Sequence, residues 1–227
     1  MLSLRYESDD KVEAGVDEAG RGCFWGDMYA GAVIWPKEAD WTDEIRALSA
    51  EIKDSKKISP KKRERIYEGI MEHAVAFGIG TVSAAEIDDN GMTWANQTAF
   101  VRAIGDLKVK PTRILIDGIL PLPSGALDAD QESHTIIEGD AQYLCIAAAS
   151  ILAKVGHDRW LQARVDAEPD LELKYNLRSC KGYGTAKHRA GIVEHGLHPM
   201  HRRLFITKKK KEERCLIRLP GTSGPTL

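Results

Sequence analysis

The sequence predicts an α/β protein built on a mixed sheet flanked by helices. Short apolar segments of strand length alternate with longer segments whose apolar residues recur at helical spacing. Three of the strand-like segments also end in carboxylates next to glycine, at Asp17-Glu18, Asp117 and Asp140. Because ligand sites in open α/β sheets form beyond the strand ends, we expect these carboxylates to mark the functional edge of the sheet.

The bulk composition excludes several classes of protein. With 227 residues, 43% of them hydrophobic, the chain can bury the core of one large domain. The formal net charge of −2 gives no global basic signature for nucleic acid. The four cysteines contain no C-x-x-C, so neither a disulfide framework nor a zinc site is expected. The polar N-terminus is unlike a signal peptide and no apolar run reaches the roughly 18 residues of a membrane helix, so we expect a cytoplasmic protein.

The first strands are expected near the N-terminus. Residues 11–16 alternate polar and apolar side chains, and residues 29–35 form an apolar run that ends before a proline. Only a short loop separates these runs, which predicts an antiparallel hairpin. Residues 37–58 are predicted to be a long polar connection. Ser59-Pro60 then starts a helix, with Ser59 as N-cap and the proline at the first helical position.

Strands and helices alternate along the middle of the chain. Residues 77–82 and 135–137 are predicted strands. Residues 113–118 form an apolar run typical of a central strand that is covered on both faces. Helices are predicted over residues 93–107 and 141–165, and small residues in the second helix should let it pack close to the sheet.

The C-terminal part is predicted to be helical and then basic. Glu168-Pro169 ends the long helix, and Thr185 caps a short helix that ends at Gly196. Residues 208–227 begin with four lysines and are expected to be a basic, disordered tail. The late histidines lack an H-E-x-x-H pattern, and most of them are interpreted as surface or supporting residues: His188, His195, His198 and His201.

Residues 12–22 carry the most chemical information. A short apolar strand runs into Asp17 and Glu18, and two glycines then flank Arg21. Adjacent carboxylates favour one another's protonation, so a bound cation or a proton must compensate their negative charge. Glycines let backbone N–H groups approach a ligand closely. The spacing matches neither a P-loop nor a dinucleotide-binding G-x-G-x-x-G, and the remaining alternative is a helix N-terminus with ordinary acidic capping.

The three carboxylate-bearing strand ends predict a shared metal site if their strands are neighbours. A single strand-end aspartate is usually a helix N-cap. Three such strand ends in one domain, each with a nearby glycine, favour the interpretation that their carboxylates lie together at one site. Ligands that are all oxygen favour Mg²⁺ or Mn²⁺ over zinc.

Two basic segments accompany this acidic centre. Residues 53–65 hold seven basic and two acidic side chains, and residues 201–214 hold the same numbers, which gives each segment a net charge of +5. Carboxylates for metals beside lysines for phosphates suit a nuclease. The alternatives are a solvated helix face for the first segment and a solubilising tail for the second.

Taken in order, these motifs resemble a known family, the type 2 ribonucleases H, or ribonuclease HII group. The resemblance spans about residues 12–205. It rests on Gly15-Val16-Asp17-Glu18-Ala19-Gly20-Arg21-Gly22, Asp54-Ser55-Lys56-Lys57, Ile116-Asp117-Gly118, Gly139-Asp140 with Ala148-Ala149-Ser150-Ile151-Leu152-Ala153-Lys154-Val155, Lys181-Gly182-Tyr183-Gly184-Thr185, and the closing His198-Pro199-Met200-His201-Arg202-Arg203-Leu204-Phe205.

The resemblance implies a ribonuclease H-like fold, a mixed five-stranded sheet flanked by helices with a helical C-terminal extension. One catalytic domain would cover residues 1–207, and the extension would begin at about residue 157. Two divalent ions, Mg²⁺ or Mn²⁺, would be bound by four carboxylates: Asp17, Glu18, Asp117 and Asp140.

Substrate contacts are implied in the same way. Gly20, Arg21 and Gly22 would contact a ribonucleotide at its 2′-OH and adjacent phosphate, and Tyr183 would sense the junction between ribose and deoxyribose. Asp158, in the family's Lys-Val-x-x-Asp position, would support the metal site without binding the metals. The lysines expected to bind phosphates are Lys56 and Lys57.

The implied activity is hydrolysis of RNA in RNA/DNA hybrids and cleavage 5′ of single ribonucleotides in duplex DNA, a step in DNA replication and ribonucleotide excision repair. Two ions about 4 Å apart would clamp the phosphate, activate a water and neutralise the leaving oxygen, giving 3′-hydroxyl and 5′-phosphate ends. The 2′-OH distinguishes RNA from DNA, so cleavage should depend little on base sequence. The alternatives are a junction resolvase of the same fold class and a non-catalytic nucleic-acid-binding protein.

Two features of the chain affect partners and substrate fit. After Gly22, the family usually has a proline and small residues, whereas this chain has the bulky segment 23–28, a candidate obstruction to substrate. The tail from Lys208 lacks the Q-x-x-[ILM]-x-x-aromatic-aromatic pattern of a sliding-clamp peptide, so clamp binding is not predicted. A monomer without membrane contact is expected.

Overall fold

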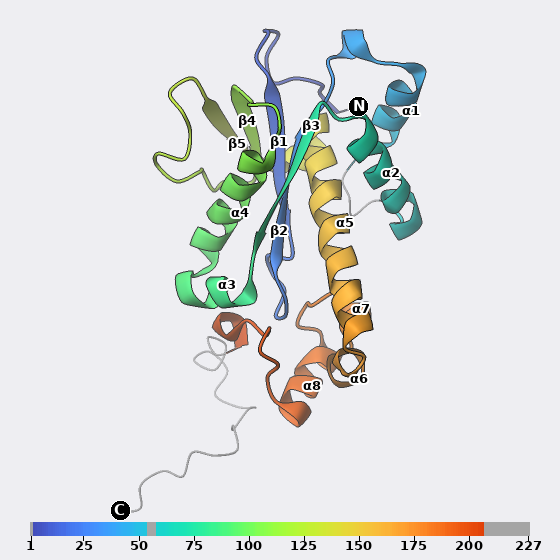
Figure 1. Cartoon of the computed structure of the whole chain (residues 1–227), viewed down its shortest axis with the longest axis vertical. Helices are drawn as coiled ribbons and strands as arrows, with labels where there is room; N and C mark the ends of the chain where they lie inside the picture. Colours follow the sequence, from blue (N-terminus) through green and yellow to red (C-terminus); the bar gives the residue numbers. More distant parts are fainter. Residues whose placement is uncertain (1, 54–57, 207–227) are drawn as a thin grey trace, which may run out of the picture.

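The computed structural model describes residues 2–53 and 58–206, and its centre is a five-stranded mixed sheet in the order β3-β2-β1-β4-β5 (Figure 1). β1 pairs antiparallel with β2 and parallel with β4, which confirms the predicted hairpin. β5 begins three residues earlier than predicted and runs parallel to β4. The strand bounds are β1 Glu13–Ala19, β2 Met28–Ile34, β3 Ala76–Val82, β4 Arg113–Asp117 and β5 Glu132–Ile136.

Helices cover both faces of the sheet, and a group of short helices lies at one end (Figure 1). The core on one face contains apolar residues of α5, α2 and α1, while the core on the other face contains those of α4 and α3. Residue 157, the predicted start of the extension, lies inside α5. The helical bounds are η1 Glu38–Asp40, α1 Asp43–Glu51, α2 Pro60–His73, α3 Ala84–Asn90, α4 Met92–Asp106, η3 Gly139–Ala141, α5 Leu144–Ala167, α6 Asp170–Tyr175, α7 Leu177–Cys180 and α8 Ala186–His195.

Glycines on the sheet let α5 lie directly against the strands. A Cβ on Gly15 would lie 2.2 Å from the carbonyl carbon of Cys145, and one on Gly31 would lie 2.5 Å from the carbonyl oxygen of Ala149. No real Cβ tolerates such approaches, so both positions require glycine. The close packing expected from the small residues of α5 is therefore confirmed.

The segment 37–58, predicted to be an irregular connection, contains the helix α1. Thr42 caps it by accepting a hydrogen bond from the N–H of Ile45. Ile45, Leu48 and Ile52 are buried at helical spacing on one side. The helix was not predicted because many of the residues between them are polar. The prediction of a helix starting at Ser59-Pro60 is confirmed, since Ser59 accepts from the N–H of Lys62.

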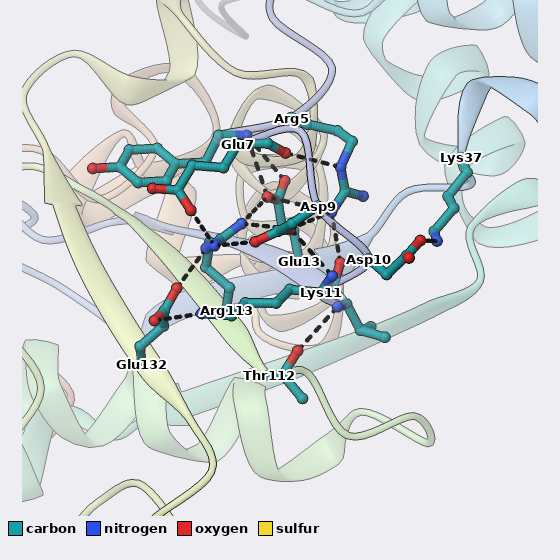
Figure 2. Close-up of polar contacts among 12 residues, drawn as sticks. Arg5, Glu7, Asp9, Asp10, Lys11, Glu13, Lys37, Thr112, Arg113 and Glu132 are labelled. Atoms are coloured by element: carbon teal, nitrogen blue, oxygen red, sulfur yellow. Dashed lines mark hydrogen bonds and ion pairs between the residues drawn. The ribbon is translucent and has the colours of Figure 1, made fainter.

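At the start of β4, a cluster of charges anchors the N-terminal segment (Figure 2). Arg113 is fully buried and its guanidinium contacts four carboxylates. The distances are 2.7 Å to Glu13 and 2.6 Å each to Glu7, Asp9 and Glu132. The segment before β1 is thereby tied to β4 and β5 at the end of the sheet opposite Asp117.

The C-terminal helices form a separate apolar cluster around Trp25, which is fully buried. Two of the late histidines lie in this region and are buried rather than at the surface: His188 and His201 are 0% and 1% exposed. His195 is exposed and His198 half-buried. The cysteines within the described ranges are free and buried: Cys23, Cys145 and Cys180. No helix in those ranges is both long and apolar enough to cross a membrane.

Candidate active site

The predicted carboxylates gather at one end of the two central strands. Asp17 and Glu18 lie near the end of β1, and Asp117 ends β4. The strands are parallel and Val16 pairs with Ile116, so the residues that follow, Asp17 and Asp117, are neighbours. The N–H of Gly139, next to Asp140 in η3, donates to Oδ1 of Asp117 at 2.7 Å. The segments that carry Asp17, Asp117 and Asp140 therefore adjoin one another at this edge of the sheet.

Strand alternation sends Asp17 and Glu18 to opposite faces of the sheet. Asp17 is 6% exposed and accepts a hydrogen bond from Ser150 of α5. Glu18 lies on the α4 side, beside the buried amide of Asn96. The side-chain amide of Asn96 lowers the pKa of Glu18.

Burial and neighbouring charges raise the pKa of two of these carboxylates, Asp17 and Glu18. Burial raises the pKa of Asp17 well above its usual range, and the charges of Glu18 and Asp117 raise it further. Burial also raises the pKa of Glu18, while Arg21 and Asn96 oppose that rise. Holding these groups ionised together therefore requires a compensating positive charge.

The donor set fits a divalent cation in type and charge. Asp17, Glu18 and Asp117 are all hard oxygen donors, and the charge of Asp117 contributes to the raised pKa of both Asp17 and Glu18. Within residues 2–53 and 58–206, no three His, Cys, Asp or Glu side chains are already gathered as ligands around one point. The residues are thus suited to a metal ion that draws their oxygens together, and Asp140 lies on the adjoining turn.

The predicted substrate loop leaves the end of β1 in a tight turn. Gly20 has a φ of +80°, and a Cβ there would lie 2.8 Å from the ring of His157, so glycine is required. Arg21 is largely exposed, with its Nη1 atom 3.6 Å from Oε1 of Glu18. Its guanidinium is therefore available to an anion beside the carboxylates.

A fully buried arginine holds this loop from behind. Nη1 of Arg202 donates to the carbonyl oxygens of Gly20 and Arg21 at 2.7 and 3.0 Å, and its Nε donates to Gly26 at 2.7 Å. Sequence reasoning assigned no role to Arg202, Ser150 or Asn96. Ser150 and Asn96 could have been noticed as polar residues on helix faces that are otherwise apolar or made of small residues. Arg202 could have been noticed because it lies in the closing motif.

Tyr183 lies beside the same loop. It forms an isolated β-bridge with Cys23, and a Cβ on Gly22 would lie 3.5 Å from its ring. The ring remains 43% exposed. Partial burial raises the pKa of Tyr183 to about 12, so the phenol is neutral. A flat, accessible ring therefore adjoins the glycine loop.

The bulky segment after Gly22 packs against the Tyr183 turn and the C-terminal helices. Trp25 is fully buried, and Phe24 is half-buried with its N–H donating to the carbonyl oxygen of Gly182 at 2.8 Å. The backbone N–H of Trp25 donates to the same oxygen at 3.2 Å. The segment thus supports the turn that carries Tyr183.

The structure gives less information on the other predicted site residues, which are Asp158, Lys56 and Lys57. Asp158 accepts from Nζ of Lys154 at 2.9 Å and lies 3.3 Å from Nδ1 of His157, the residue that packs against Gly20. It is thereby connected to the loop, and its support of a metal site stays a prediction. Lys56 and Lys57 lie outside the described residues. In the rest of that basic segment, Lys62 and Arg65 form ion pairs with Glu51.

Comparison with known proteins places this site in a family. The ribonuclease HII family model matches residues 14–208. Ribonuclease HII of Bacteroides thetaiotaomicron is 42% identical over 206 residues, which cover 90% of this chain and 94% of that protein. The crystal structure of ribonuclease H2 from Pyrococcus horikoshii has a TM-score of 0.69 at 28% identity and covers 89% of this chain and 97% of its own.

A more distant neighbour supports the fold alone. The crystal structure of Bst-RNase HIII in complex with Mn²⁺ has a TM-score of 0.56 at 18% identity, covering 79% of this chain and 68% of its own. The family match and the identity over nine-tenths of the chain settle the assignment. The chain belongs to the ribonuclease HII family, and it is a ribonuclease H, a metal-dependent endonuclease that acts on RNA/DNA hybrids.

Proposed function

We propose that this ribonuclease also cuts duplex DNA on the 5′ side of a single embedded ribonucleotide and leaves 3′-hydroxyl and 5′-phosphate ends. The observation that carries this proposal is the juxtaposition of Gly22 and the exposed Tyr183 ring beside the carboxylates. A Cβ on Gly22 would lie only 3.5 Å from that ring. The glycine loop can bind a single 2′-OH, and the ring can contact the neighbouring sugar.

The two elements would read a junction rather than a run of ribose. Backbone groups of the Gly20–Gly22 loop can satisfy one 2′-OH, which both donates and accepts hydrogen bonds. The ring of Tyr183 offers a flat surface to a sugar that lacks the 2′-oxygen and would crowd one that has it. A single ribonucleotide followed by DNA supplies both features.

Arg21 would hold the phosphate next to the ribonucleotide. Its guanidinium is exposed and adjoins Glu18, so a bound phosphate would lie between this cation and the carboxylates. Planar guanidinium groups suit phosphate oxygens because two N–H groups can donate in parallel. The contact would orient the scissile bond without reading the bases.

Two divalent ions, Mg²⁺ or Mn²⁺, would be held by Asp17, Glu18, Asp117 and Asp140. When bound, such ions supply an activated water and neutralise the charge of the leaving oxygen. The protein's part is to keep Asp17 buried against Ser150 and to fix Asp117 through the N–H of Gly139. Both contacts limit the freedom of the ligands.

The test is cleavage of two labelled duplexes in Mg²⁺ and in Mn²⁺. One duplex carries a single ribonucleotide and the other a run of four, and product ends are mapped at nucleotide resolution. We expect both to be cut, with the cut 5′ of the single ribonucleotide. An all-DNA duplex should resist, because the donors and acceptors of the loop would then lose a partner, at a cost of about 1–3 kcal/mol.

Tyr183→Ala tests the junction contact itself. It should reduce cleavage of the single-ribonucleotide duplex more than cleavage of the four-ribonucleotide duplex, while Mg²⁺ titration is unchanged. Leu173→Ala, at an exposed position of α6, is the matched surface control. Cleavage of the longer run alone by the unmodified enzyme would refute the junction mechanism.

A further inference from the structure

Behind the Tyr183 turn lies a buried pair of histidines whose role in the reaction is unassigned. His188 and His201 are 0% and 1% exposed, and their Nε2 atoms are 2.9 Å apart. His188 belongs to α8, whereas His201 follows it in the closing segment. The ring of Tyr175 packs edge-on against His201, with 4.7 Å between the ring centroids. The pair is therefore enclosed by protein.

The hydrogen-bond partners determine where the protons are. Nδ1 of His188 lies 3.0 Å from the carbonyl oxygen of Tyr183, which can only accept, so Nδ1 of His188 carries a proton. Nδ1 of His201 receives the N–H of His198 at 2.8 Å, so it carries none. In the neutral pair, Nε2–H of His201 then donates to the bare Nε2 of His188.

The chain of hydrogen bonds has one direction. It runs from the backbone N–H of His198 through His201 and His188 to the carbonyl oxygen of Tyr183. An added proton on His188 would place two N–H groups face to face at 2.9 Å in a buried site. Burial lowers the pKa of both rings, that of His201 to about 3, which keeps the pair neutral.

The turn that carries Tyr183 lies at the end of this series of hydrogen bonds, and its backbone conformation requires contacts from surrounding residues. Lys181 and Gly182 both have left-handed backbone conformations, with φ of 49° and 80°. For Lys181 this conformation is unfavourable unless surrounding contacts impose it. The backbone N–H groups of Phe24 and Trp25 donate to the carbonyl oxygen of Gly182. From the other side of the turn, Nδ1 of His188 donates to the carbonyl oxygen of Tyr183.

We propose that His188, oriented by His201, is a positioning residue that fixes the Tyr183 turn and so sets the preference for the ribose–deoxyribose junction. The inference rests on the proposed role of Tyr183. Neither histidine needs to touch the substrate. Their effect is to hold the backbone from which the Tyr183 ring reaches the neighbouring sugar.

The experiment compares kcat and KM on the single-ribonucleotide and four-ribonucleotide duplexes for a set of variants. His188→Leu removes one of the two donors to the carbonyl oxygen of Tyr183 and leaves the N–H of Thr185 at 2.8 Å, whereas His188→Asn keeps an N–H donor near the position of Nδ1. We expect His188→Leu to lower the ratio of kcat/KM between the two duplexes by about tenfold, the equivalent of one lost buried hydrogen bond. His188→Asn should restore most of that ratio. His195→Leu, at the exposed end of the same helix, should leave it unchanged.

Two results separate this inference from the function on which it rests. If Tyr183→Ala leaves the ratio unchanged, the proposed role of Tyr183 is refuted and the positioning role falls with it. If Tyr183→Ala lowers the ratio but folded His188→Leu does not, the positioning role alone is overturned. Thermal unfolding of every variant identifies those that fold.

A measurement on the unmodified enzyme keeps the inference testable if His188→Leu fails to fold. The ¹⁵N shifts of the histidine rings report which nitrogen carries the proton. We expect the Nδ1–H form for His188 and the Nε2–H form for His201 at neutral pH. The opposite form at His188, or a charged ring, would overturn the proposed chain of hydrogen bonds.

Discussion

Replacing Arg113 by methionine tests how firmly the N-terminal segment is tied to the sheet. Arg113→Met keeps an unbranched side chain but removes the guanidinium from a fully buried position. Glu13 is then left nearly buried, with a side chain only 5% exposed, and loses its contact at 2.7 Å. Removing one partner of a buried ion pair costs about 3–5 kcal/mol, because the other charge remains desolvated.

The structure places the expected cost at the lower end of that range. The other three carboxylates of the cluster can regain water, since the side chains of Glu7, Asp9 and Glu132 are 59%, 32% and 38% exposed. Glu13 also keeps the N–H of Tyr6 as a donor at 3.1 Å. We therefore expect a loss of about 3 kcal/mol in the free energy of unfolding.

Urea unfolding followed by circular dichroism measures this loss. Lys110→Met is the matched control, because Lys110 is half-exposed and pairs with Asp128 and Asp130 at the surface. Such exposed pairs contribute about 1 kcal/mol or less. The reasoning is refuted if Arg113→Met costs no more than Lys110→Met. The cleavage rate of folded Arg113→Met should stay near that of the unmodified enzyme, because the cluster lies at the opposite end of β4 from Asp117.

The charges of the molecule lead to three further predictions. Arg113 lowers the pKa of Asp9 from 3.8 to about 2, and Lys11 together with Arg113 lowers that of Glu132 from 4.5 to about 2. The two ionised carboxylates therefore stabilise the fold fully above their ordinary pKa values, and this stabilisation is lost as the pH falls towards 2. When the free energy of unfolding is followed in an acid titration, Arg113→Met should lose less stability than the unmodified enzyme. Asp117→Asn should reduce cleavage by about a thousandfold or more, the equivalent of several kcal/mol of metal-derived stabilisation, while a binding assay shows duplex affinity largely intact; cleavage near the unmodified rate in Mg²⁺ would contradict the four-carboxylate assignment. Duplex affinity should fall steeply with salt through counterion release, and deleting residues 208–227 should reduce the salt slope without moving the cut site.

The sheet and its main helices could be predicted because their cues are local. Residues 11–16 and 29–35 alternate or cluster by strand rules, and Ser59-Pro60 fixes a helix start within two residues. The helix α1 was missed because only Ile45, Leu48 and Ile52 mark its buried side. Its other residues are polar or alanine, as suits a helix at the surface, and therefore look like those of a connection.

The carboxylates could be predicted for a related reason. Asp17 lies near the end of β1 and Asp117 ends β4, and parallel neighbouring strands bring their ends together without further information. Ser150, Asn96 and Arg202 could not be assigned in this way, because their contacts depend on how helices and the closing segment pack. Arg202 reaches Gly20 across 182 positions of sequence, a relation that no local pattern reports.

The segment 23–28 shows how packing changes the meaning of a sequence feature. Bulky side chains after a glycine loop suggest an obstruction when only the loop is considered. In the fold, Trp25 is buried among the C-terminal helices, and its backbone N–H and that of Phe24 both bind the carbonyl oxygen of Gly182. The Tyr183 turn is therefore held between this segment and the histidine pair. Under the proposed mechanism, substitutions in residues 23–28 should change the choice between single ribonucleotides and longer hybrids, since they move the turn rather than open a path to the metals.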